Sequence, residues 1–295
     1  MTAASVATAK TTLAVVSIGY LVPRPRFGGV VQSIHARACN IRCGDALLTL
    51  LAPGACEGPT TLLLDCDCAL DLRTCFRVGD AVARRGTRLL SCGADADLSH
   101  AVDWKPAAMP PFAEASKIAA NLCTARTMLA ARLEQHASVL HREARTTCAR
   151  LEQACRACDS DMALPAAERL IGWGEGLTPA GDDYLVGLMA GLYSLSAELP
   201  LRRIFLRCLA AAVLASVAST TPVSAHFLRL AAHGHFTADV HRVRDALLSA
   251  NEVAPLRRFV DDMLAVGATS GADVLTGLLS GICAWFQPPP TPNRT

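Results

Sequence analysis

Short apolar runs separated by turn-forming residues dominate the first hundred residues of the chain. The runs are rich in leucine and β-branched residues, are punctuated by glycine, proline and aspartate, and occupy residues 13–18, 30–34, 46–51, 61–64 and 87–91. Runs of this length and spacing are typical of strands in small barrels and sandwiches. The pattern therefore predicts a β-rich N-terminal domain over residues 1–105.

The apolar period changes after residues 106–111, which we interpret as a linker. Between Ile118 and Cys155 apolar residues recur every four or seven positions, which predicts one long amphipathic helix or two in series. Further helices are expected at residues 182–196, 201–219, 224–233, 240–250, 256–266 and 273–286. Ser224 can serve as the N-cap of one of them, and Gly234 suits the left-handed position after it. The predicted fold class is α+β, with the β-rich domain, a larger all-helical domain over 112–287 that carries the candidate site, and a disordered tail over 288–295.

Charge, hydropathy and cysteine content exclude several classes of protein. The formal net charge is only +2 and the arginines are scattered, so we expect no nucleic-acid partner. The longest apolar stretch, residues 208–218, predicts an alanine-rich core helix and is shorter than the ~20 residues of a membrane span. Thirteen cysteines are an odd number with no zinc-ribbon spacing. We expect free thiols in a cytoplasmic protein.

The most informative segment is Gly174-Glu-Gly-Leu-Thr-Pro-Ala-Gly-Asp-Asp-Tyr-Leu-Val-Gly187. It places glycines, a hydroxyl, a proline and two adjacent carboxylates at the entrance of an apolar helix. Glycine allows positive φ or a close approach of the backbone to a ligand, and the first N–H groups of a helix can bind an anion. We therefore expect any chemistry to lie here.

The same pattern returns ninety positions later. Six identities relate the two segments: Gly181, Asp183, Leu185, Gly187, Leu188 and Gly191 correspond to Gly271, Asp273, Leu275, Gly277, Leu278 and Gly281. Such an internal echo indicates two helices that each begin at a glycine and that meet at one site. Glycines four residues apart share a helix face, which favours close helix packing over ligand contact.

Three interpretations of the aspartates remain open. Asp182 and Asp183 could bind a divalent cation together with Asp273, orient the donors of a ligand, or complement the helix dipole. His226, His233, His235 and His241 do not place three side chains on one helix face, so surface histidines are favoured over a zinc site. The sequence has no serine elbow, no P-loop and no strand followed by Gly-x-Gly-x-x-Gly.

Residues 176–183 resemble the G-L-T-P-S-G-D-D signature of a bacterial family that includes the small subunit associated with oxamate carbamoyltransferase in allantoin breakdown. Residues 31–41, 58–59, 221–234 and 267–273 are similar to further segments of that family. Ala180 stands where the family has serine and Gln32 where it has histidine.

The resemblance implies a subunit of a carbamoyl- or acyl-transfer enzyme that acts on a small oxamate- or ureide-like anion with carbamoyl phosphate. Its partner would be a larger, acyl-CoA-synthetase-like subunit. The alternative is a non-catalytic scaffold subunit that binds a small ligand.

In the transfer enzyme, backbone N–H groups at residues 178–181 and 270–272 would hold an oxyanion or phosphate. The expected catalytic residues are Asp182, Asp183 and Asp273, which would also hold Mg²⁺ if a metal is used. The expected ligand-binding residues are Gly176, Thr178, Gly181, Thr221, Ser224, Ser270 and Gly271.

Overall fold

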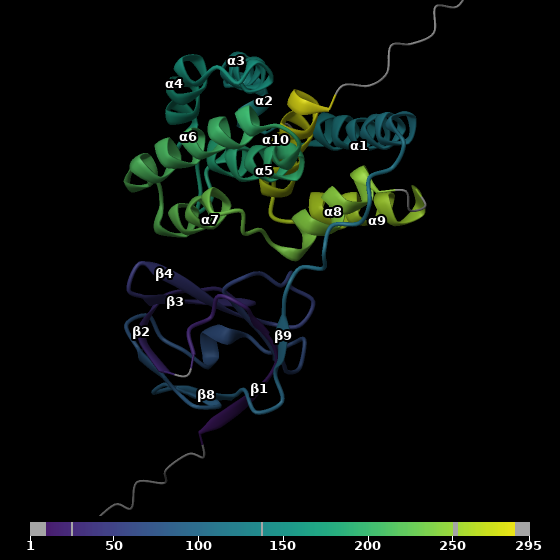
Figure 1. Ribbon diagram of the computed structural model, residues 1–295. Coiled ribbons are helices and arrows are strands. Elements are labelled where there is room, and N and C mark those ends of the chain that lie inside the picture. Colours follow the sequence, from purple (N-terminus) through teal and green to yellow (C-terminus); the bar gives the residue numbers. More distant parts are fainter. Residues whose placement is uncertain (1–9, 25, 137, 250–252, 287–295) are drawn as a thin grey trace, which may run out of the picture. The chain divides into compact units, whose positions relative to one another are not determined.

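The chain folds into two compact units that divide between Pro106 and Ala107, inside the predicted linker. The computed structural model describes residues 10–286 apart from 25, 137 and 250–252 (Figure 1). The predicted disordered tail, residues 288–295, lies outside the described residues. The first unit is a β-barrel and the second is all-helical, so the predicted α+β class is confirmed.

The N-terminal unit is built from one nine-stranded sheet that closes on itself. The strands follow the order β5-β4-β3-β2-β6-β7-β8-β1, and β1 also pairs with β5, while β9 extends the edge of β1 beside β8. Their bounds are β1 Thr11–Gly19, β2 Arg26–Ile34, β3 Ala38–Cys43, β4 Ala46–Leu51, β5 Thr61–Asp65, β6 Ala81–Arg85, β7 Arg88–Leu90, β8 Ala94–Asp97 and β9 Val102–Trp104, with the 3-10 helix η1 at Leu72–Thr74. Closure leaves β1–β8 without a free sheet edge.

The alternation of buried apolar residues and exposed residues along the strands shows which side chains face the interior of the barrel. On β1, Leu13 and Val15 point inward and the next inward residue is Ile18, because a bulge between Val15 and Ser17 shifts the register against β5. Strands β3, β6, β8 and β9 are not among the predicted runs. Charged residues such as Arg42 and Asp95 interrupt their apolar pattern.

The C-terminal unit is a bundle in which α5 and α10 lie at the centre, with α6 and α7 on one side and α1, α8 and α9 on the other (Figure 1). The helices are α1 Ala115–Gln135, α2 Val139–Glu143, α3 Arg145–Ala157, α4 Ser160–Leu170, α5 Ala180–Leu195, α6 Pro200–Ser216, α7 Pro222–Ala232, α8 Ala238–Leu248, α9 Val253–Leu264 and α10 Ser270–Trp285, with 3-10 turns η2 at Ser196–Glu198 and η3 at Val217–Ser219. Both central helices are buried almost all round, as expected for helices without a solvated face.

Several local predictions need correction. The segment predicted as one or two helices between Ile118 and Cys155 forms three, because Ser138 caps a new helix by accepting a hydrogen bond from the N–H of Leu140. Helix α4 contains Pro165 and is not among the predicted helices.

Two predictions about helix termini have different outcomes. The cap of α7 is Thr221, whose hydroxyl accepts from the N–H of Ser224 at 3.1 Å, so the assignment of Ser224 as the cap is wrong. Gly234 has φ +76° after α7, and its predicted left-handed position is confirmed.

Candidate functional site at the start of two parallel helices

Glycines let α5 and α10 pack backbone against backbone. A Cβ atom on Gly187 would lie 1.9 Å from the carbonyl oxygen of Val274, and one on Gly277 would lie 1.9 Å from that of Tyr184. Gly191 and Gly281 repeat the relation one turn later against Leu278 and Leu188. Residues equivalent under the ninety-residue echo thus make equivalent contacts, which requires the two helices to run parallel. Their N-termini therefore lie at the same end of the bundle.

The glycines at the two helix starts are engaged with the preceding helices. A Cβ on Gly181 would lie 2.0 Å from the carbonyl oxygen of Leu170, and one on Gly271 would lie 1.8 Å from that of Met263. The N–H of Gly181 donates to Trp173 at 2.9 Å and that of Gly271 donates to Val266 at 3.1 Å. Because these two N–H groups already donate to carbonyl groups of the chain, they are not available to bind an oxyanion, as was expected of residues 178–181 and 270–272.

Asp182 joins three segments of the chain through hydrogen bonds. Its carboxylate accepts from the N–H of Gly172 at 2.8 Å, from the hydroxyl of Ser224 at 2.7 Å and from that of Thr220. The residue is fully buried. With its oxygens occupied by protein donors, Asp182 is placed to fix the α4–α5 loop against the start of α7.

Asp183 and Asp273 differ from Asp182 because they retain unused oxygens. Asp183 Oδ2 and both carboxyl oxygens of Asp273 have no hydrogen-bond partner among the described residues. Asp183 is 8% exposed and Asp273 is fully buried. Leaving buried polar atoms unpaired costs free energy, so this pair is not explained by stability.

The hydroxyls of Thr178 and Ser270 join the two helix starts. They lie 3.0 Å apart in one hydrogen bond, and both residues are half-buried. Both hydroxyls also act on the pKa of Asp183, which places them beside its carboxyl group. Thr178, Ser270, Asp183 and Asp273 therefore form one cluster, which we call the carboxyl cluster.

Burial controls the protonation of the carboxyl cluster. It raises the pKa of Asp183 to about 8, the hydroxyls of Ser270 and Thr178 act in the opposite direction, and the charges of Asp273 and Asp182 raise the pKa further. Burial likewise raises the pKa of Asp273 to about 6, and the neighbouring side chains of Ser138 and Thr269 oppose this rise although neither makes a well-formed hydrogen bond to the carboxyl group. At pH 7 Asp183 is mainly a neutral acid and Asp273 is mainly a carboxylate.

The remaining predicted ligand-binding residues do not join this cluster. Thr221 donates to the carbonyl of Leu177 and caps α7, and Ser224 donates to Asp182. Gly176 lies in an exposed loop with φ +93°. Sequence reasoning missed Ser138, Thr220 and Gly172. Only Ser138 had a local signal, as a serine directly before an apolar pair at a helix start.

A metal centre finds no support in the described part of the chain. It contains no group of three or more histidine, cysteine or acidic side chains arranged to hold an ion, and this includes the three aspartates. His226 and His241 are buried, so their prediction as surface residues is wrong. Burial lowers the pKa of each to about 4.

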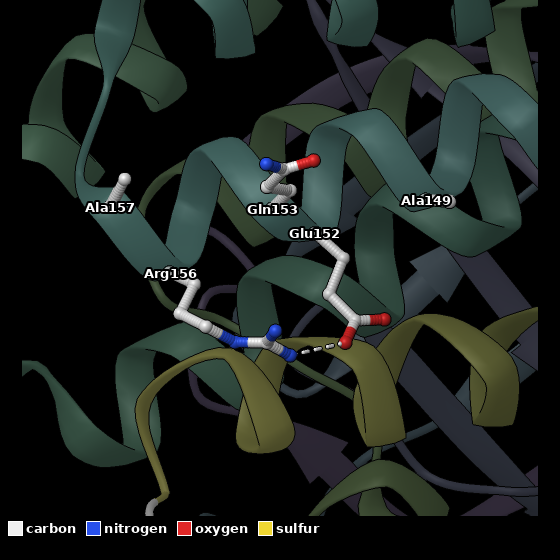
Figure 2. A pocket seen from close by; sticks show the side chains of 5 residues that line it. All are labelled: Ala149, Glu152, Gln153, Arg156 and Ala157. Atoms are coloured by element: carbon white, nitrogen blue, oxygen red, sulfur yellow. Dashed lines mark hydrogen bonds and ion pairs between the residues drawn. The ribbon is translucent and has the colours of Figure 1, made fainter.

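The outer side of α3 carries a hollow that is separate from the predicted site. Figure 2 shows its lining, which consists of Ala149, Glu152, Gln153, Arg156 and Ala157, with Arg156 donating to Glu152 at 2.9 Å. None of the predicted site residues lines this hollow. Both charges are already paired across one helix turn, as is common on solvated helix faces.

The fold and the cluster define a two-unit protein in which a closed β-barrel precedes a helical unit with buried carboxyl groups at a pair of repeated helix starts. Residues 11–104 match the model of the AllH family N-terminal domain, and residues 170–282 match the model described as oxamate carbamoyltransferase subunit AllH. Together the two matches cover more than half of the chain, which belongs to the AllH family. No solved structure matches the chain. Among the described residues, no helix is both long and apolar enough to cross a membrane.

Proposed function

We propose that this chain is a subunit of a carbamoyl-transfer enzyme that binds a small oxamate- or ureide-like anion and uses carbamoyl phosphate as the donor. The description of the family model supports the class of reaction. The observation that carries the assignment to a site is Asp183, a buried carboxyl group with an unpartnered oxygen at the joined starts of two parallel helices.

The protonation of Asp183 supports an anionic ligand. An ionised Asp183 would repel an anion, whereas its neutral carboxyl group donates a hydrogen bond to it. The charge of the more deeply buried Asp273 opposes the anion, so the donors at the two helix starts have to outweigh it. The positive ends of two helix dipoles point to the same place and attract negative charge. The hydroxyls of Thr178 and Ser270 supply further polar contacts.

In the proposed transfer, an acceptor nitrogen attacks the carbonyl carbon of the carbamoyl group, a C–N bond forms, and the C–O bond to phosphate breaks. Asp183 would donate a proton to the departing phosphate, and the proton that the acceptor nitrogen loses as the C–N bond forms would restore the Asp183 carboxyl group. Asp273, with its lower pKa, would keep Asp183 protonated through its own charge. Asp273 is fully buried and is therefore a positioning residue.

The same geometry also suits a non-catalytic subunit that binds the ligand for a larger, synthetase-like partner. Titration calorimetry with oxamate and phosphate release by the reconstituted complex separate the two functions. Asp183→Asn keeps a neutral donor of equal size, so binding should persist, while turnover should fall by about 10²–10⁴-fold if Asp183 transfers a proton. Asp183→Ala should lose both.

Unchanged turnover with Asp183→Asn would favour the scaffold function. Unchanged oxamate binding with Asp183→Ala would refute the site. Glu175→Gln, on the exposed loop beside the site, is the matched control and should change neither quantity.

A further inference from the structure

Helix α6 presents an apolar stripe on the side turned away from the bundle. Leu199, Leu201 and Ile204 are 51%, 59% and 49% exposed, and Cys208, Ala211 and Ala215 continue the exposed face. The buried residues of α6, among them Phe205, Leu209 and Val213, lie on the opposite face. The predicted alanine-rich core helix is thus only half in the core.

The spacing of the stripe is that of a helix-packing seam. Positions 201, 204, 208, 211 and 215 alternate steps of three and four residues, which keeps them on one side over four turns. A solvated helix face normally carries polar residues, yet none of these five is charged. Large residues at the start and alanines at the end would let a second helix approach closely.

Arginines run along one flank of this stripe. Arg203 and Arg207 are exposed, and neither forms an ion pair with a described residue. Helix α6 contains no aspartate or glutamate. A second copy of α6 would therefore bring arginines without carboxylates to meet them, since a two-fold contact uses the same surface twice.

We infer that the outer face of α6 binds an acidic amphipathic helix of another subunit. The inference rests on the proposed function only for the identity of that subunit. Leu201 and Ile204 provide the apolar anchors, and the two arginines select acidic flanks and speed association. The residues of the carboxyl cluster lie at the starts of α5 and α10 and are not part of this face.

The first experiment measures assembly with the other subunits of the transferase by light scattering after size exclusion. Ile204→Glu and Arg207→Glu should each weaken assembly by about tenfold or more. Val78→Glu, at a 66% exposed position in the barrel unit, is the matched control and should assemble normally. Equal assembly of the wild-type and Ile204→Glu chains would overturn the inference.

The second experiment tests the surface without any native partner. A synthetic helix with leucine at the a and d positions and glutamate at e and g should bind the full chain, more weakly at high salt, and Ile204→Glu should abolish binding. The lysine version of the same helix should bind at least about tenfold more weakly.

Equal binding of the two peptides would overturn the proposal that the partner is acidic. The same holds if the chain alone forms a dimer that Ile204→Glu dissociates. If the wild-type chain assembles with no other subunit, the proposed function fails, while the peptide result still decides the docking face.

Discussion

Asp183 on α5 and Asp273 on α10 occupy equivalent positions in the first turns of two parallel helices, and the charge of Asp273 raises the pKa of Asp183. Their sequence separation is the period of the internal echo. Each carries a buried oxygen without a hydrogen-bond partner. The internal repeat therefore places two unpaired carboxyl groups at the same end of the bundle.

Stability should fall as the pH rises from 6.5 to 8. Asp183 titrates near 8 in the folded chain and near 3.8 as a free side chain, so in this interval the folded state binds a proton that the unfolded state releases. The loss is at most about 1.4 kcal/mol per pH unit for one group.

Urea unfolding at several pH values measures this slope. The interval avoids His226 and His241, whose lowered pKa values make stability rise only between about 4 and 6.5. Asp183→Asn should flatten the profile, and an unchanged slope in that variant would contradict the raised pKa.

Replacement of the two adjacent aspartates should destabilise the chain to very different extents. Asp182→Ala leaves the N–H of Gly172 and the hydroxyls of Thr220 and Ser224 without their acceptor, so it should cost about 3 kcal/mol or more. Asp183→Asn keeps the shape and removes a buried carboxyl group, so it should cost less than about 1 kcal/mol. Denaturant midpoints with matched m-values check this, and equal losses would remove the distinction between the two residues.

Side chains at the helix crossing should be poorly tolerated. Gly187→Leu or Gly277→Leu forces a Cβ into a carbonyl oxygen of the other helix and should destabilise the chain by about 1–3 kcal/mol or more. Gly28→Ala is the control, because a Cβ there meets nothing within 4 Å. Thermal melting distinguishes them, and a Gly277→Leu chain that melts with the wild type would show that the helices do not touch there.

The cysteines should react as free thiols once the chain is unfolded. All thirteen are free in the structure, and burial raises the pKa of Cys155 and Cys148, the latter to about 12, so both should react slowly in the folded chain. Intact mass after alkylation in denaturant without reductant should show thirteen additions. Pairs of missing additions would reveal disulfides.

Regular patterns made much of the fold predictable. The apolar runs at residues 46–51 and 61–64 were enough to predict β4 and β5. The ninety-residue echo predicted that α5 and α10 meet. Short strands such as β8, with Asp95 and Asp97 facing out, lack that signal. Their place in the sheet depends on pairing with residues far away in sequence.

The different roles of Asp182 and Asp183 were not predictable from the sequence. Asp182 and Asp183 are neighbours with the same chemistry, but a helix turns by about 100° between them. One therefore faces Gly172, Thr220 and Ser224, and the other faces Ser270. Only the packing of α4, α7 and α10 around this turn separates them.

The sequence by itself determined a β-rich N-terminal unit, a helical unit and two repeated helices that each begin at a glycine and an aspartate, because these depend on local period and residue type. The tertiary structure decided that β1 closes the barrel on β5, that α5 and α10 run parallel, and that Asp183 rather than Asp182 keeps an unused oxygen. Those outcomes depend on contacts between residues far apart in the chain, where burial and the supply of hydrogen-bond donors are fixed only after folding.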